Sequence, residues 1–225
     1  MPVYNEERFV EQSARRVLKA NTCALELELI IVNDGSTDGT AVVIDAVAKE
    51  DCRVRVFHQP KNMGKGAALR RGFREAAGEI VLVQDADLEY DPIDYPLLLS
   101  PLLDGRADVV FGSRFLGGPH RVLYYWHSVL NKFLTHLSNI TTNLNLSDIE
   151  VGYKVFKREI LEKINLRSDR FGFEPEITAK VARTKCRLYE TPISYSGRSY
   201  QEGKKIGWKD GVQALYFIFR YAWID

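Results

Sequence analysis

The sequence has few cysteines, almost no excess charge and no long apolar run, and each shortage excludes a class of protein. Its three cysteines are widely spaced and form no CxxC pair. We therefore expect neither a disulfide framework nor a zinc knuckle, and a reducing compartment fits best. The 31 Lys and Arg residues against 30 Asp and Glu leave a net charge of +1. A protein with so little net charge has no overall positive potential that would attract nucleic acid.

Segments that would direct the chain to or through a membrane are also missing. The longest apolar run covers residues 214–219, far short of the ~20 residues that span a bilayer. The start, MPVYNEERFVEQ, is charged within its first eight residues and has no apolar core, so it does not resemble a secretory signal. We therefore expect a cytosolic protein, in which the sequons at Asn139 and Asn145 are chance matches.

Apolar runs of strand length alternate with helical patterns in the first two-thirds of the 225 residues. Expected strands cover 27–32, 54–57, 80–84 and 108–113, and expected helices cover 40–50, 67–78 and 95–103. This alternation indicates a parallel sheet covered on both faces, whose ligands bind at the carboxyl ends of the strands. After these come expected helices at 121–141, 158–164 and 174–185, and strands at 153–156 and 187–195. We divide the chain into an α/β domain, 1–200, and a basic loop with an aromatic helix, 201–225.

An acidic loop, DADLEYDPID, follows the strand at 80–84. Its carboxylates are Asp85, Asp87, Glu89, Asp91 and Asp94. Like charges this close usually persist because a cation lies between them. An EF-hand is excluded because its sixth and twelfth positions hold Tyr90 and Pro96 instead of Gly and Glu. Two interpretations of the loop remain. One is a Mg²⁺ or Mn²⁺ site with two carboxylate ligands, completed by phosphate oxygens. The other is a solvated loop in which Asp87 or Asp91 caps a helix.

The segment GKGAAL also needs an explanation, because it follows a strand and opens a helix as a dinucleotide fingerprint does. Here Leu69 replaces the third glycine, and six residues separate Phe57 from Gly64 where a tight turn is expected. A hydride-transfer enzyme would also have no use for a carboxylate cluster beside the pyrophosphate. No GK[ST] occurs in the chain, which excludes a Walker-type loop.

Five segments taken together, PVYNE, NDGSTDGT, NMGKGAALRRGF, DADLEYDP and GSR, resemble the family-two glycosyltransferases of the GT-A fold. The later stretches YKVFKRE, FGFEPEITAKVAR and GRSYQEGKKIGWKDG look like the branch with dolichyl-phosphate mannose synthase and related polyprenyl-phosphate sugar transferases. The resemblance implies a Rossmann-like, mostly parallel sheet flanked by helices, with a C-terminal amphipathic helical appendage. It also implies a metal-dependent hexosyltransferase that uses GDP-mannose or UDP-glucose. Because the chain begins inside the first motif, a shortened first strand is expected.

The resemblance further implies roles for individual positions. The family's first nucleotide-binding loop and its base-recognising acidic residue are matched by Pro2, Tyr4, Glu6 and Asp34. The D-x-D motif that holds metal and donor diphosphate, with a further position that reaches the metal, is matched by Asp85, Ala86, Asp87 and Glu89. Cationic positions that face phosphates are matched by Arg114, Arg198 and Lys204. Of all these, Asp85, Asp87 and Arg114 are expected to carry catalysis.

Several of these positions have an alternative interpretation. Tyr4 also fits a core residue, and Asp34 a turn or capping residue. Arg198 and Lys204 form either a lid over the donor or a solvated basic tail. The basic residues Lys65 and Arg70 are predicted to form a helix face rather than to bind ligands. The segment DIEVGYKVF departs from the family pattern around Asp148 and Glu150, which weakens any role for either residue.

The nature of the acceptor decides whether a general base is needed. We expect single displacement with inversion at the anomeric carbon. A polyprenyl or dolichyl phosphate is already anionic and needs no base, whereas a sugar hydroxyl needs one, for which Glu174 or Glu176 would be the candidate. The four histidines, His58, His120, His127 and His136, lie in no recognisable constellation. A glycan or small-molecule acceptor and a non-catalytic nucleotide-sugar binding subunit stay open as alternatives.

The C-terminal helix favours contact with a membrane. Its aromatic residues follow a basic stretch, which suits a helix lying at the cytosolic face of a bilayer. The helix around 122–137 offers a second such surface. The alternative is that both helices pack on the core or on a partner, such as a small membrane protein.

Overall fold

The computed structural model describes residues 1–117, 120–122, 124–170, 172–198 and 208–223. Its strands are β1 (Pro2–Val3), β2 (Leu29–Asn33), β3 (Val54–His58), β4 (Ile80–Val83), β5 (Val109–Ser113), β6 (Lys154–Lys157) and β7 (Leu188–Pro192). Its helices are α1 (Val10–Leu18), α2 (Thr40–Glu50), α3 (Lys65–Glu75), α4 (Tyr95–Leu103), α5 (Tyr125–Thr142), α6 (Arg158–Glu162), α7 (Phe173–Thr184) and α8 (Trp208–Trp223), and a 3-10 turn covers Pro92–Asp94.

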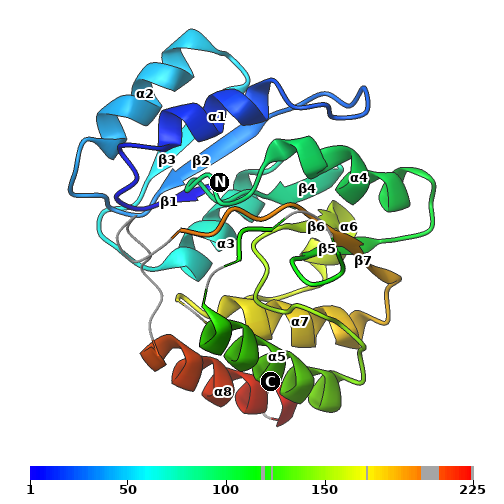
Figure 1. Ribbon diagram of the computed structural model, residues 1–225. Coiled ribbons are helices and arrows are strands. Elements are labelled where there is room, and N and C mark those ends of the chain that lie inside the picture. Colours follow the sequence, from blue (N-terminus) through cyan, green and yellow to red (C-terminus); the bar gives the residue numbers. More distant parts are fainter. Residues whose placement is uncertain (118–119, 123, 171, 199–207, 224–225) are drawn as a thin grey trace.

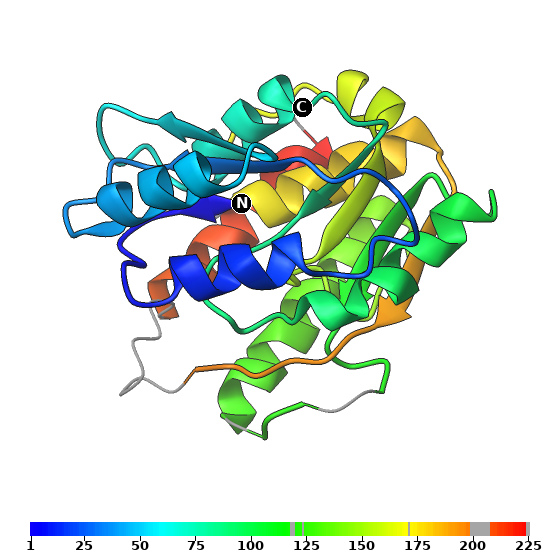
Figure 2. The ribbon, with the colours of Figure 1, turned by 90° about the horizontal axis from the view of Figure 1, so that it is seen from above.

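The first half of the fold is a three-stranded parallel sheet in the order β1-β2-β3. Successive residues of β2 point to opposite faces, so Leu29 and Ile31 join the core under α1 and α2. Ile30 and Val32 pack against α3 on the other face. Figures 1 and 2 show the strands lying between these two sets of helices. This burial on both faces explains why β2 reads as a continuous apolar run.

The second sheet is mixed, whereas the alternation of strands and helices by itself indicates a parallel sheet. Its order is β4-β6-β5-β7, and β6 runs antiparallel to both β4 and β5, whereas β5 and β7 are parallel. Strand β6 enters between β4 and β5 only after the chain has passed through α5. An apolar pattern reveals that a strand is buried but not its direction, so the sequence could not show this insertion.

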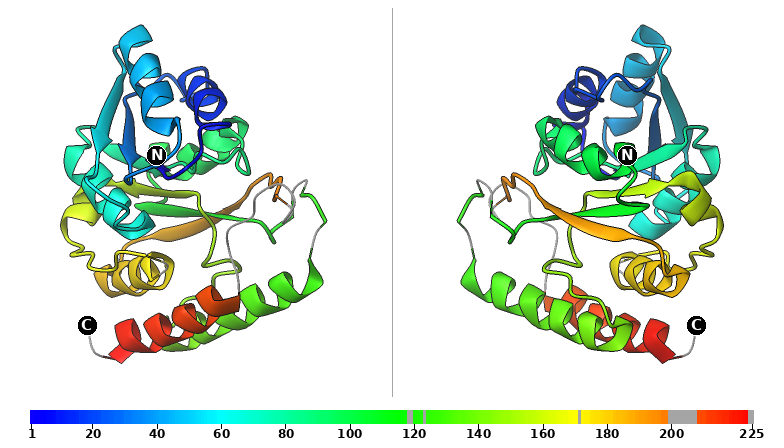
Figure 3. Two further views of the ribbon diagram at one scale, coloured as in Figure 1. Left: turned by 90° about the vertical axis from the view of Figure 1, so that its left-hand side faces the viewer. Right: turned by 90° about the vertical axis from the view of Figure 1, so that its right-hand side faces the viewer.

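Three helices form a layer below the second sheet in Figures 1 and 3, with α7 next to the strands and α5 and α8 outside it. Helix α8 approaches α5 closely at Gly211, where an added Cβ would lie 2.7 Å from Leu130. It is also held by Tyr221, whose hydroxyl lies 2.6 Å from the Oγ of Ser168. The expected domain boundary at residue 200 lies outside the described residues.

Hydropathy gives no sign of a bilayer span in the part of the chain that the structure describes. No helix there is both long enough and apolar enough to cross a membrane.

Candidate active site

The polar loops predicted to meet at the carboxyl ends of the strands do lie together. Asp34 follows β2 and is 3% exposed. Its carboxylate accepts hydrogen bonds from the backbone N–H groups of Met63 and Gly64, at 2.8 and 2.7 Å, and from Gln59 at 2.7 Å. Asp34 thus fixes the loop after β3 against the loop after β2. Its role in recognising a base stays a prediction.

The loop after β3 places Lys65 at the centre of the site. Gly64 has a φ of +101°, and a Cβ there would lie 2.2 Å from the carbonyl oxygen of Asp169. Only glycine fits this turn, after which α3 begins at Lys65. The ammonium of Lys65 lies 3.1 Å from Asp85 and 3.3 Å from Glu174. Although burial opposes the charge, these two carboxylates raise the pKa of Lys65.

The loop before β6 closes the other side of Asp85. A Cβ at Gly152 would lie 2.4 Å from the Oδ2 of Asp85, so glycine alone leaves room for the carboxylate. The N–H of Gly152 donates to the hydroxyl of Tyr90 at 2.9 Å. The carboxylate of Asp85 is therefore held between Lys65 and the backbone of Gly152.

Arg198 links three carboxylates that come from two different loops. Its guanidinium lies 3.4 Å from Glu6, 3.1 Å from Asp87 and 3.3 Å from Glu89. Glu89 also accepts from the backbone N–H of Arg198 at 2.9 Å and from the hydroxyl of Tyr195 at 2.8 Å. The segment after β7 is thus drawn onto the acidic loop by charge, as a lid over a donor would be.

The acidic loop carries more negative charge than its neighbours balance. Burial, together with the charges of Asp85 and Glu89, raises the pKa of Asp87 to about 7, against the opposing effect of Arg198. Among the described residues, no three acidic, histidine or cysteine side chains gather into a ready-made metal cage. A Mg²⁺ or Mn²⁺ ion needs only one or two carboxylates when substrate phosphates and waters complete its shell. Carboxylate oxygens also suit these ions, so Asp85 and Asp87 fit one.

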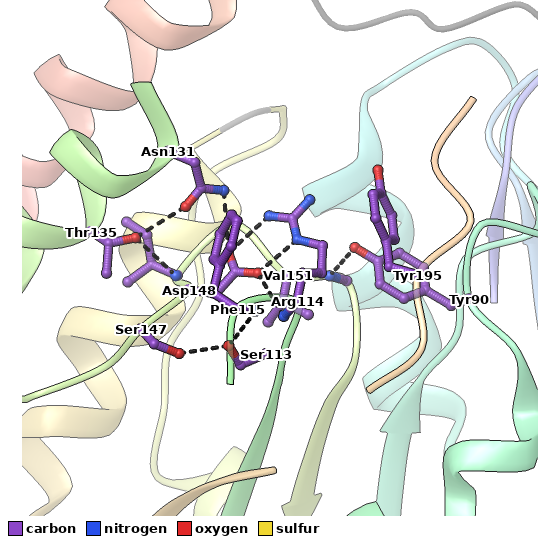
Figure 4. Close-up of polar contacts among 12 residues, drawn as sticks. Tyr90, Ser113, Arg114, Phe115, Asn131, Thr135, Ser147, Asp148, Val151 and Tyr195 are labelled. Atoms are coloured by element: carbon purple, nitrogen blue, oxygen red, sulfur yellow. Dashed lines mark hydrogen bonds and ion pairs between the residues drawn. The ribbon is translucent and has the colours of Figure 1, made fainter. Parts of the chain in front are cut away.

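A second cationic centre lies at the end of β5 (Figure 4). Arg114 donates to both oxygens of Asp148, from Nε at 2.6 Å and from Nη2 at 2.8 Å. Asp148 is fully buried and also accepts from the Nδ2 of Asn131 at 3.2 Å. The guanidinium of Arg114 also lies over the ring of Tyr195, 5.1 Å from the ring centroid. Although burial opposes the charge, Asp148 raises the pKa of Arg114.

Groups behind this pair hold Asp148 in turn. Glu190 on β7 accepts from the backbone N–H groups of Ser147 and Asp148, at 2.9 and 3.3 Å. The hydroxyls of Ser113 and Ser147 lie 2.5 Å apart (Figure 4). The bidentate geometry of Arg114 therefore rests on a network of partly buried hydrogen bonds, which restricts its orientation.

The remaining predicted residues lie around this site with different exposures. Pro2 pairs with Val32 in the first sheet, and Ala86 is buried between the two aspartates of the D-x-D motif. Tyr4 is 37% exposed and so is not a core residue. Lys204 lies outside the described residues.

The residues for which an alternative was considered have structural partners. Glu176 accepts from the N–H groups of Arg167 and Ser168 and from Lys180, each at 2.7 Å. Asp91 caps the 3-10 turn by accepting from Ile93 at 3.0 Å, as the solvated-loop interpretation expects for this one residue. Asp87 instead lies beside Arg198.

Sequence reasoning missed Lys65 and Tyr195 as parts of the site. The sequence predicts Lys65 on a basic helix face rather than in the site, yet it is the first residue of α3 and reaches Asp85. The available signal was its place directly after a glycine in a loop at the carboxyl end of a strand. No local signal points to Tyr195, because its partner Glu89 is 106 residues away.

Comparison with known proteins identifies the family of the chain. Residues 1–165 match the family described as Glycosyl transferase family 2. An undecaprenyl-phosphate mannosyltransferase of Micrococcus luteus is 31% identical over 214 residues, which cover 92% of this chain and 86% of that protein. A polyprenol monophosphomannose synthase of Mycolicibacterium smegmatis is 33% identical over 215 residues, with 92% and 80% covered.

Solved structures show the same fold. Glucosyl-3-phosphoglycerate synthase of Mycobacterium tuberculosis, solved with Mn²⁺, UDP and phosphoglyceric acid, gives a TM-score of 0.76 at 22% identity, covering 100% of this chain and 77% of that one. A mannosyltransferase of Pyrobaculum calidifontis with GDP-Man and Mn²⁺ gives 0.70 at 23%, covering 100% and 63%. The expected α/β fold of the GT-A type is confirmed. The chain belongs to glycosyl transferase family 2.

Proposed function

We propose that this protein transfers a hexose from a nucleotide sugar, GDP-mannose or UDP-glucose, to a polyprenyl or dolichyl phosphate, with inversion at the anomeric carbon. One observation supports this more than any other. Two partly buried cationic centres, Lys65 with Arg198 and, separately, Arg114, flank the aspartates at the tip of β4. Two separate anion-binding centres suit a reaction in which both the leaving group and the nucleophile are phosphates.

The donor diphosphate lies at the D-x-D carboxylates in this proposal. Asp85 and Asp87 hold a Mg²⁺ or Mn²⁺ ion, with Glu89 as a further candidate, and such an ion supplies Lewis-acid stabilisation of the leaving diphosphate. Lys65 and Arg198, now paired with these carboxylates, are within reach of phosphate oxygens bound there. Glu6 and Asp34 fix the loops that would enclose the nucleotide. The names of the two bacterial relatives refer to undecaprenyl phosphate and to polyprenol monophosphomannose, which supports a lipid phosphate as the acceptor.

The acceptor is better explained as a phosphate than as a hydroxyl. A hydroxyl needs a general base with a free carboxylate. Glu176 is occupied by three hydrogen bonds, and Glu174 is paired with Lys65. Burial raises the pKa of Glu150 to about 8, so this carboxyl group keeps its proton near neutral pH. Asp148 is occupied by Arg114. A lipid phosphate brings its own negative charge, which Arg114 is placed to bind, and needs no base.

The lipid part of the acceptor requires contact with a membrane surface, where we place the protein. Helices α5 and α8 lie side by side on the outside of the molecule (Figure 3). On α5, Tyr125 and Trp126 are 71% and 76% exposed, and on α8 Tyr216 and Phe219 are 60% and 49% exposed. Aromatic side chains of this kind insert at the lipid interface.

A transfer assay tests the reaction. Purified protein with Mn²⁺, polyprenyl phosphate in detergent and labelled GDP-mannose or UDP-glucose should yield a lipid-linked sugar. The double variant Asp85→Asn/Asp87→Asn should lose turnover, whereas Asp91→Asn, an exposed carboxylate of the same loop, should retain it. Turnover that survives in the double variant would refute the proposal. Full cellular function without turnover would indicate a binding subunit.

Sedimentation with liposomes tests the membrane surface. Trp126→Ser combined with Tyr216→Ser should weaken binding to vesicles of phosphatidylglycerol and phosphatidylcholine. Val42→Ser removes a 75% exposed apolar side chain from α2 and should leave binding unchanged. If the wild-type protein stays in the supernatant, α5 and α8 instead cover a protein partner.

A further inference from the structure

Glu150 lies in the loop that joins α5 to β6, and it differs from its neighbours in solvent exposure. Between Asp148 and Phe156, it alone is partly exposed, while the others are buried. Its Oε1 is nevertheless shielded from solvent and has no hydrogen-bond partner in the described structure. Buried polar atoms in native proteins almost always have a partner. An unpartnered carboxyl oxygen in a fixed loop therefore suggests a ligand that supplies one.

The backbone on both sides of Glu150 is fixed. The carbonyl oxygens of Ile149 and Val151 both accept from the buried ammonium of Lys154. The side chains of Ile149 and Val151 are themselves fully buried. Glu150 thus projects from a rigid support, as side chains that position a substrate need to do.

The loop places Glu150 between the two anion-binding centres. Two residues earlier, Asp148 holds Arg114, the proposed ligand of the acceptor phosphate. Two residues later, Gly152 lies against Asp85, the proposed ligand of the donor diphosphate. In the proposed reaction, the transferred hexose lies between these two phosphates. Glu150 is therefore placed to contact the hexose itself.

Burial favours the neutral form of Glu150, and the charges that face it act in both directions. They come from Glu174 on α7, Lys154 on β6, Arg114 after β5 and Asp148 in the same loop. Burial, followed by Glu174, raises the pKa of Glu150 to about 8, against the lowering effect of Lys154 and Arg114. A carboxyl group that keeps its proton near neutral pH can donate a hydrogen bond, which a carboxylate cannot do.

We propose that Glu150 donates a hydrogen bond to a hydroxyl of the transferred hexose and so helps to select the sugar. This inference rests on the proposed function, because it needs a hexose between the two phosphates. It assigns Glu150 to sugar binding rather than to base catalysis. It also gives a role to a carboxyl group that forms no ion pair with the described residues.

Titration calorimetry with Mn²⁺ tests the proposal, using wild type, Glu150→Ala and Glu150→Gln against GDP-mannose, UDP-glucose, GDP and UDP. Loss of one hydrogen bond should weaken binding of the preferred nucleotide sugar by about 3- to 10-fold in the alanine variant. Binding of the nucleoside diphosphate, which has no hexose, should not change. Glutamine also donates a hydrogen bond and should bind the nucleotide sugar within about twofold of wild type.

The pH dependence gives a second readout. Wild-type affinity for the nucleotide sugar should fall as the pH rises through about 8, because ionised Glu150 can no longer donate and its negative charge then lies beside the anionic nucleotide sugar. In the glutamine variant, this fall should be absent. Glu162→Gln, on the surface of α6 with 62% of its side chain exposed, serves as the control and should behave as wild type.

Three results would overturn the assignment. One is equal weakening of nucleotide sugar and nucleoside diphosphate in the alanine variant, and another is no weakening of either; both indicate a structural role. The third is normal donor affinity with loss of turnover in the glutamine variant, which indicates a base acting on a hydroxyl acceptor. A wild-type protein that binds none of the four nucleotides is a different result, because it refutes the proposed function itself.

Discussion

Replacing Asp148 with asparagine tests whether Arg114 is held as the structure indicates. Asp148 is fully buried and accepts from the Nε, Nη2 and backbone N–H of Arg114, at 2.6, 2.8 and 3.2 Å. Asparagine keeps the shape, but it places an NH₂ group against these donors and leaves the guanidinium charge uncompensated. Breaking a buried ion pair on one side costs about 3–5 kcal/mol. For a chain of this size, the melting temperature should fall by on the order of 10 °C.

An exposed pair with the same chemistry provides the control. Arg106 donates to one oxygen of Asp104 from Nε at 2.8 Å and from Nη2 at 2.6 Å, but these side chains are 56% and 42% exposed. Water replaces the lost partner there, so Asp104→Asn should not measurably change the melting temperature. Combining Asp148→Asn with Arg114→Met removes both charges and should recover part of the loss. Equal shifts in calorimetry for Asp148→Asn and Asp104→Asn would refute the reasoning.

Three further substitutions test other parts of the structure. Gly152→Ala places a Cβ 2.4 Å from the Oδ2 of Asp85 and should abolish Mn²⁺-dependent donor binding in a thermal-shift assay; unchanged binding would contradict the described fit. Hydrogen bonds from Arg187 lower the pKa of Asp108, so this group stabilises the fold above pH ~4, the unfolded pKa. Urea unfolding should show Asp108→Asn less stable by about 1–3 kcal/mol near neutral pH, with the difference vanishing as the pH falls through the lowered pKa; a constant difference would exclude this linkage. Tyr221→Phe removes the hydroxyl that anchors α8 and should speed hydrogen exchange in α8, whereas unchanged exchange would show that packing alone holds the helix.

The strands and the loops at their ends could be predicted from the sequence, because local physics determines them. A parallel strand buried on both faces reads as a continuous apolar run, as β2 does. Polar loops after such strands must meet at one edge of the sheet, which is how Asp34 comes to bind the loop that precedes Lys65. These inferences need no knowledge of contacts between distant segments.

The parts that could not be predicted all depend on such distant contacts. The ion pairs of Arg198 with Glu6 and Glu89 join residues 192 and 109 positions apart, and no periodicity in the sequence records them. The role of Asp148 depends on its complete burial beside Arg114, which the departure of DIEVGYKVF from the family pattern concealed. The direction of β6 depends on its pairing with β4 and β5, between which it lies. In each case, tertiary packing decides the result.

The charges of the site explain why the metal ion and the donor should depend on each other. Five carboxylates lie at the donor side, from Glu6, Asp85, Asp87, Glu89 and Glu174, and two cations, Lys65 and Arg198, balance them. Burial and the excess of negative charge together raise the pKa of Asp87, and the excess would repel a diphosphate. A divalent cation bound at Asp85 and Asp87, as we propose, would remove most of this excess and would free Lys65 and Arg198 to face phosphate oxygens. A diphosphate, in turn, supplies the ligands that two carboxylates leave open on the metal. Because linkage is reciprocal, each must increase the affinity of the site for the other by the same factor.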